Sequence, residues 1–127
     1  MVNVINNILD KLKSVEALKY VDMYYSQDES KMNLIKFPAV LVNLVNINYN
    51  KVATTAYDRT LTIGMLFFYT AVKPCAEKEI EALEILDDIY QVLRNELEIT
   101  FKDASCIERT STLTTYYIEL EYSGDLI

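Results

Sequence analysis

The sequence predicts a single α+β domain, residues 1–127, in which two helices pack against an antiparallel or mixed sheet. Two segments repeat apolar residues at helical intervals, and three others alternate apolar and polar residues with a period of two. Only two glycines and two prolines interrupt the chain, so regular elements should dominate it. With 51% hydrophobic and 24% charged residues, 127 residues are enough for one core.

The first helix is expected over residues 3 to 19. Its apolar positions recur every three or four residues, at Val4, Ile5, Ile8, Leu9, Leu12 and Val15. Residues 20–26 then favour a short strand, and residues 27–33 a polar loop. The chain therefore begins with a helix and a strand.

A long hairpin is expected next, and its first strand begins at Pro38, which has no N–H to give to a ladder. Apolar side chains of the first half fall on one parity, at Val40, Val42 and Leu44. Those of the second half fall on the other parity, at Val45, Ile47 and Tyr49. A β-bulge or a sharp twist between Leu44 and Val45 would keep both halves facing the core.

The second strand of the hairpin is expected over residues 57–70, after a loop at residues 50–57. Its apolar positions alternate, at Leu61, Ile63, Met65, Phe67 and Tyr69. Leu66 and Phe68 make the opposite face apolar as well. Two long strands joined by a short loop indicate a hairpin.

The hairpin is long for the size of the domain. A compact chain of this length has a diameter of roughly 35 Å, whereas twelve strand residues span roughly 40 Å. Twist and bulges could shorten both strands until they fit the core. Otherwise the projecting edge requires a second chain to cover it, and Leu66 and Phe68 are then candidates for a subunit interface.

The second helix, expected over residues 75–95, has two distinct sides. Its acidic stripe consists of Glu77, Glu81, Glu84 and Asp88. Its apolar arc covers roughly 200°, wider than the roughly 100° of a one-sided surface helix. The part of the arc around Ile85 and Val92 therefore requires either the first helix, which we favour because it belongs to the same chain, or a neighbouring subunit.

Residues 115–122 alternate again and predict a final strand. Its apolar positions are Tyr116, Ile118, Leu120 and Tyr122. Residues 105–110 could form a further short strand before it. The expected order of elements is therefore α-β-β-β-α-(β)-β.

Residue types that carry catalysis or bind metals are scarce. The chain has no histidine, which is the commonest general base near neutral pH. Cys75 and Cys106 are far apart in the sequence and form no CxxC pair, so we expect reduced thiols and no zinc site. Two isolated glycines cannot form a phosphate-binding loop. We therefore expect no enzyme activity, no catalytic residue, no metal and no cofactor.

The charge of the chain is uneven. Residues 1–75 hold eight basic and six acidic side chains, whereas residues 76–127 hold four basic and thirteen acidic ones. This distribution indicates either a soluble protein with one acidic helix or subunits whose opposite ends attract each other. It lacks the basic patch of a nucleic-acid-binding protein. No stretch approaches the ~20 apolar residues of a membrane span, so we expect a cytosolic protein, or one assembled there, without a membrane partner.

The order of these elements is specific enough to compare with a known architecture. An amphipathic helix and a short strand precede FPAVLV at residues 37–42 and the long hairpin. The helix EIEALEILDDIYQVLRNEL and the late strand TTYYIELEYSGD follow. This pattern resembles the tail-terminator, or tail-completion, proteins of bacteriophages, over nearly the whole chain.

The resemblance implies a structural virion protein, assembled in the cytoplasm of the bacterial host. In that family the subunits form a ring, typically of six copies, which caps the tail tube and joins it to the head connector. DNA passes through the lumen without specific binding. On this interpretation Glu77, Glu81, Glu84 and Asp88 would face the lumen and repel DNA phosphates. The hairpin loop would dock to the tube or connector, through Lys51, Val52, Thr54, Thr55 and Tyr57.

Two other functions remain open from the sequence. A small ligand- or partner-binding module would be a stable monomer or two-fold dimer with an enclosed pocket. An enzyme comes third, because the chain offers no plausible catalytic groups.

Overall fold

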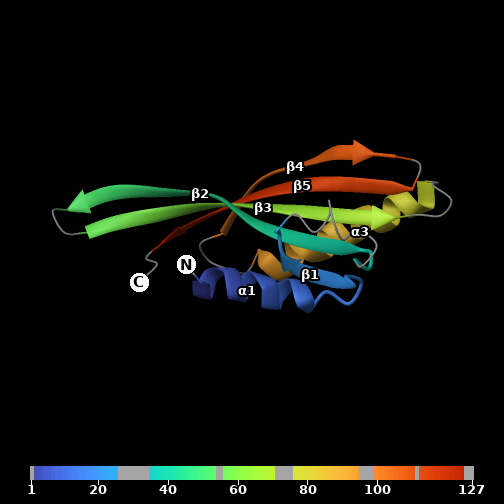
Figure 1. The fold of residues 1–127 in the computed structure, drawn as a ribbon, viewed down its shortest axis with the longest axis horizontal. Helices are drawn as coiled ribbons and strands as arrows, with labels where there is room; N and C mark the ends of the chain where they lie inside the picture. Colours follow the sequence, from blue (N-terminus) through green and yellow to red (C-terminus); the bar gives the residue numbers. More distant parts are fainter. Residues whose placement is uncertain are drawn as a thin grey trace.

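A computed structural model describes residues 2–25, 35–53, 56–70, 76–94, 99–110 and 112–124. Its elements are α1 (Val2–Lys13), β1 (Tyr20–Met23), β2 (Ala39–Ala53), β3 (Ala56–Thr70), α3 (Ala76–Leu93), β4 (Ile99–Arg109) and β5 (Leu113–Gly124). The strands form one sheet in the order β1-β2-β3-β5-β4 (Figure 1). β1 is parallel to β2, and the other pairs are antiparallel. The expected α+β fold and order of elements are confirmed.

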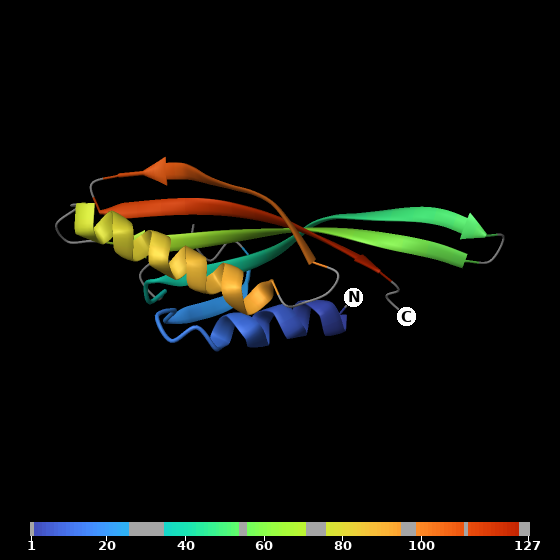
Figure 2. The ribbon, with the colours of Figure 1, turned by 180° about the vertical axis from the view of Figure 1, so that it is seen from behind.

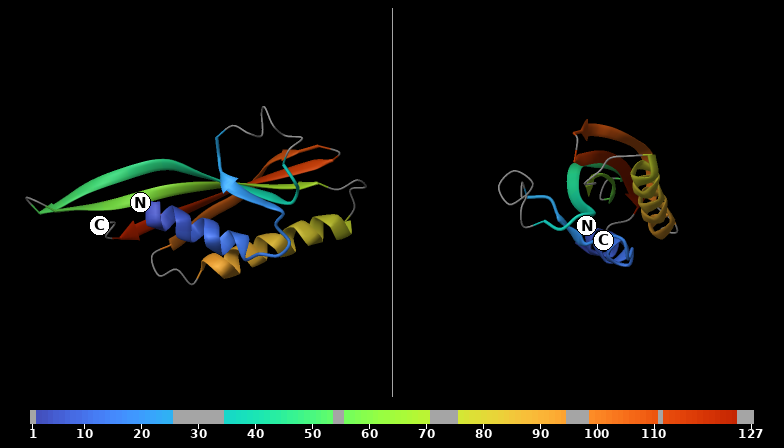
Figure 3. Two further views of the ribbon diagram at one scale, coloured as in Figure 1. Left: turned by 60° about the horizontal axis from the view of Figure 1, so that its bottom comes forward. Right: turned by 90° about the vertical axis from the view of Figure 1, so that its right-hand side faces the viewer.

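Both helices lie against the same face of the sheet, as Figures 2 and 3 show. The main core fills the space between them and the sheet. Its buried residues are Ile8, Leu12, Val40, Val42, Leu61, Ile63, Met65, Phe67, Tyr69, Ala82, Ile85, Ile89, Leu93, Tyr116, Ile118 and Leu120. The alternating positions expected on the second strand of the hairpin are all among them, because the period of two places each of these side chains on the helix-covered face.

The first helix is shorter than expected and ends at Lys13. The hydroxyl group of Ser14 donates a hydrogen bond to the carbonyl of Lys11, 2.6 Å away. The backbone N–H groups of Ser14 and Val15 bond three residues back, to Lys11 and Leu12. Bonds of this shorter spacing replace the helical ladder, because a serine side chain competes for carbonyls that the next helical turn would use.

The strand predicted over residues 105–110 is present but much longer, because β4 already begins at Ile99. Two bulges interrupt its pairing with β5, between Phe101 and Asp103 and between Cys106 and Glu108. These irregularities break the period-two pattern by which a strand is recognised in the sequence.

The predicted slip in the hairpin is a β-bulge. Pairing with β3 passes from Leu44, opposite Ile63, directly to Asn46, opposite Thr62. The extra residue, Val45, is 49% exposed. The bulge therefore allows the apolar side chains on both sides of it to face the core.

The prediction of a loop over residues 50–57 is wrong, because the strands extend further into this segment. β2 continues to Ala53 and β3 begins at Ala56, with Asn50 opposite Asp58 and Lys51 opposite Tyr57. Asparagine and lysine are poor strand formers on average. The β2–β3 pairing of the preceding residues nevertheless continues through Asn50 and Lys51 to Ala53.

The hairpin projects well beyond the helices (Figure 1). Each strand has fifteen residues, which at the usual rise span roughly 50 Å. The third strand of this region, β5, pairs with β3 only as far as Gly124, opposite Arg59. Coiling therefore does not shorten the hairpin to the size of the core, and its outer part is a two-stranded ribbon.

Candidate functional site

The acidic stripe predicted on the second helix lies on α3. All four of its side chains are exposed: Glu77, Glu81, Glu84 and Asp88. Asp88 lies on the side of α3 that faces the end of α1, where it lines a shallow hollow of about 590 Å³ together with Ser14 and Gln91. The stripe is therefore a continuous carboxylate surface along the α1 side of the helix.

Glu81 is the one member of the stripe tied to the sheet by a hydrogen bond among those observed. The hydroxyl group of Tyr69, in β3, donates to Oε2 of Glu81 at 2.5 Å, and Nζ of Lys78 lies 3.3 Å from the same oxygen. The bond from Tyr69, followed by that from Lys78, lowers the pKa of Glu81. Both donors favour the charged carboxylate, so this end of the stripe keeps its negative charge in mildly acidic solution.

Removing the tyrosine hydroxyl group should raise the pKa of Glu81. In Tyr69→Phe the carboxylate loses its main donor, and its pKa returns toward that of an ordinary glutamate. Because the folded-state pKa is lowered, the bond contributes stability above the ordinary glutamate range, and this contribution is lost as the pH falls through the folded pKa. NMR titration of the Glu81 carboxyl carbon measures the change, with Tyr49→Phe as the control. An unaltered Glu81 titration in Tyr69→Phe would contradict the assignment.

The opposite side of α3, toward β4, is apolar and exposed. Leu83 and Tyr90 are 49% and 44% exposed there, while Ile80, 54% exposed, lies on the outer face of the helix between this side and the acidic stripe. Glu79 on the same side forms an ion pair with Arg109 of β4, which ties this flank of the helix to the edge strand. The apolar arc of the helix therefore remains uncovered on its β4 side.

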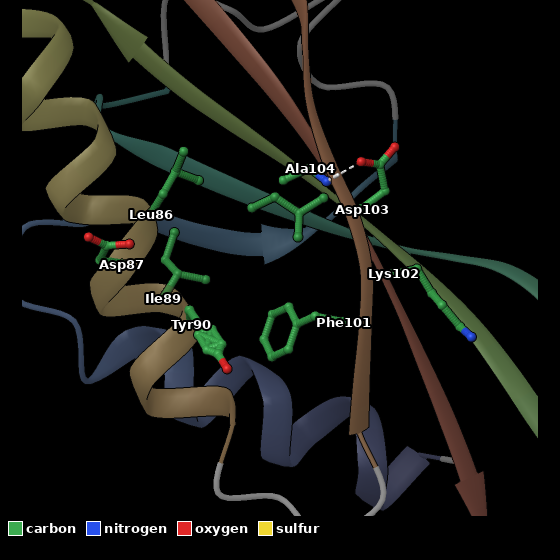
Figure 4. Close-up of a pocket in the computed structure, with 9 residues that line it drawn as sticks. Leu86, Asp87, Ile89, Tyr90, Phe101, Lys102, Asp103 and Ala104 are labelled. Carbon is green, nitrogen blue, oxygen red and sulfur yellow. Dashed lines mark hydrogen bonds between the residues drawn. The ribbon is translucent and has the colours of Figure 1, made fainter.

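An open groove of about 500 Å³ runs between α3 and β4 (Figure 4). Its lining residues are Leu86, Asp87, Ile89, Tyr90, Phe101, Lys102, Asp103, Ala104 and Ile118. The rings of Tyr90 and Phe101 meet across it, with their centroids 4.8 Å apart. The groove thus has an apolar floor and a charged rim at Asp87, Lys102 and Asp103.

Of the four residues expected at a subunit interface, Ile85 and Phe68 are buried within one chain, and Leu66 and Val92 are half-buried. Ile85 is 8% exposed and belongs to the main core, which matches the alternative that the same chain covers it. Phe68 is 4% exposed in a smaller cluster on the opposite face of the sheet, where Leu66 packs beside it. Val92 is half-buried beside the end of α1.

The expected docking loop is described only in part. Lys51 is exposed near the end of β2. Thr54 and Thr55 lie outside the described residues, as do the side chains of Val52 and Tyr57. Lys51 is therefore the member of this group that can be placed on the projecting ribbon with its side chain.

Within the described ranges, no group of three or more histidine, cysteine or acidic side chains could hold a metal ion. Cys106 is an exposed free thiol, and Cys75 lies outside those ranges. No helix of the described chain is long and apolar enough to cross a membrane. No protein-family model and no curated protein matches this chain.

Proposed function

We propose that the protein is a structural component of a phage virion, which forms a ring at the end of the tail or in the head-tail connector. The observation that carries this proposal is the two-stranded ribbon that extends beyond the helices of its own chain. A ribbon with two exposed strands is stable chiefly when other elements cover it. The ring would cap the tail tube, join it to head-connector proteins and leave a lumen for DNA.

The geometry of one chain supports head-to-tail assembly. The ribbon extends from one end of the molecule (Figure 1), while the apolar groove lies between the C-terminal half of α3 and the start of β4 (Figure 4). Two different patches on one subunit generate a heterologous contact, and such a contact closes into a ring when the rotation between subunits permits it. The acidic stripe occupies a third surface of the subunit and is free to face the lumen.

A second candidate function is a small ligand- or partner-binding module that acts as a monomer or dimer. The groove favours it to some extent, since its volume lies within the range of ligand-binding clefts. This groove is open rather than enclosed, however, and a ligand in it would leave the projecting ribbon without a role.

Electron microscopy of the purified protein, with and without tail tubes and across a concentration series, separates the two functions. Rings, alone or seated on tube ends, are the expected result. Closed dimers would support the binding module instead. Monomers under every condition, including excess tail tubes, would contradict the ring.

A further inference from the structure

The groove between α3 and β4 has an apolar surface that suits an apolar partner. Leu86, Ile89, Phe101 and Ile118 form its floor, and Leu83 extends the apolar surface along the helix with an exposed fraction of 49%. Exposed apolar surface that continues from a groove onto its flank is typical of interaction sites. The groove lies on the β4 side of α3, away from the acidic stripe, so it can be filled while the stripe stays exposed.

The projecting hairpin offers an exposed aromatic ring. Tyr49 lies at the base of the two-stranded part, where β5 ends, and is 55% exposed. Tyr49 stands opposite Arg59, two residues beyond the pair of Ile47 and Leu61, and so belongs to the helix-covered face of the sheet, yet its ring remains uncovered. A tyrosine with an uncovered ring and a polar end is a common interface anchor.

The charges of the two surfaces are complementary. The rim of the groove holds two carboxylates, Asp87 and Asp103, and Lys102, which forms an ion pair with Glu121. The single charged side chain of β2 is Lys51, which is exposed two residues from Tyr49. Opposite charges around an apolar contact favour this pairing and disfavour the pairing of two grooves.

A second copy could in principle dock by adding a strand to the edge of the sheet. At one edge, β1 has only four residues. At the other edge, the two bulges and the exposed Lys102 of β4 disturb the row of free backbone groups. These features protect edge strands against pairing. Insertion of side chains into the groove therefore suits the surface better than strand addition.

We propose that the groove between α3 and β4 receives the projecting β2–β3 ribbon of a second copy of this chain, with Tyr49 seated among Leu86, Tyr90 and Phe101. The ribbon extends away from the groove of its own chain, so the contact must join different copies (Figure 1). This inference rests on the head-to-tail assembly of the proposed function and assigns the two surfaces that carry it.

Photo-crosslinking tests the assignment directly. A benzoylphenylalanine in place of Tyr49 should crosslink to peptides 83–90 and 101–104 of another copy, which is identified by mixing isotopically labelled and unlabelled protein. The same group in place of Asn48 is the matched control, because neighbouring strand residues point to opposite faces. In the acceptor copy, Leu83→Lys and, separately, Tyr90→Lys should each lower the crosslinked fraction by roughly tenfold, as expected for a central contact.

Crosslinks from position 49 to another ribbon, to its own chain or to no peptide at all would overturn the assignment. So would equal yields from positions 49 and 48. The outcome is separable from that of the proposed function. Rings in the microscope with crosslinks elsewhere would leave the ring standing and refute this contact. Crosslinks at the groove in open filaments or dimers would uphold the contact and refute the ring.

Discussion

Replacing Phe67 with alanine is expected to lower the free energy of unfolding by about 3–5 kcal/mol, the usual cost of truncating a buried aromatic residue. Phe67 is fully buried toward the C-terminal end of β3, and its ring stacks on Tyr116 of β5 with the centroids 6.3 Å apart. Small domains have only about 5–15 kcal/mol of stability in total. The variant should therefore lose a large fraction of the stability of the domain.

Chemical denaturation followed by circular dichroism measures this loss. The matched control is Tyr49→Ala, which removes an aromatic ring that one chain leaves 55% exposed. It should change the stability of the monomer by no more than about 0.5 kcal/mol. A loss at Tyr49 as large as that at Phe67 would mean that the ribbon is packed within its own subunit, and would contradict a ribbon that needs a second copy to cover it.

Replacing Glu77, Glu81, Glu84 and Asp88 together with glutamine or, for Asp88, asparagine should leave assembly intact and cause the ring to retain DNA. All four side chains are exposed on α3, so their loss costs little packing. A surface of one charge alters the local concentration of charged partners by roughly tenfold or more. Without that repulsion, DNA retention at low salt should rise by a similar factor and fall again as salt is added.

The control for this variant removes four other carboxylates, at Asp10, Glu16, Glu108 and Glu119. The net charge of the protein then changes by the same amount, but the stripe remains. Filter binding of DNA by assembled rings compares the two variants. Unchanged retention at low salt in the stripe variant would remove the lumen assignment, and equal gains in both variants would attribute the effect to net charge alone.

The sequence predicts the central elements well because their side chains alternate strictly between two faces. In β3 every second residue from Leu61 to Tyr69 is buried, and the slip after Leu44 correctly marks a bulge. The end of α1 is harder to predict. A hydrogen bond from Ser14 ends the helix, although the apolar repeat continues to Val15, which is buried beyond the helix.

The candidate groove could not be predicted for a related reason. The helical wheel of α3 identifies an apolar arc that is wider than one-sided packing requires. It does not indicate which edge of this arc the rest of the chain covers. The end of α1 covers the edge at Val92, while that at Tyr90 and Leu83 stays open. Phe101 is also missed, because the bulges in β4 interrupt the alternating pattern and the strand is expected to begin only at residue 105.

Gly64 makes a close contact with a side chain of the neighbouring strand, which the sequence alone does not identify. It is buried in β3, and the ring of Tyr117 from β5 lies across it, so that an added Cβ would be 2.6 Å from the tyrosine hydroxyl oxygen. Burial, followed by the nearby charge of Glu119, raises the pKa of Tyr117. Glycine within a strand often marks such a close approach, but the sequence does not say which side chain makes it.

Hydrogen–deuterium exchange along the ribbon is the most direct measurement of whether a sister subunit covers it. The backbone amides of residues 49–53 should exchange more slowly as the protein concentration rises from micromolar to near-millimolar, or when tail tubes are added, while those of the buried residues 61–69 of β3 stay equally protected. Ribbon exchange that is the same at every concentration and with tail tubes present would contradict coverage of the ribbon by a second copy.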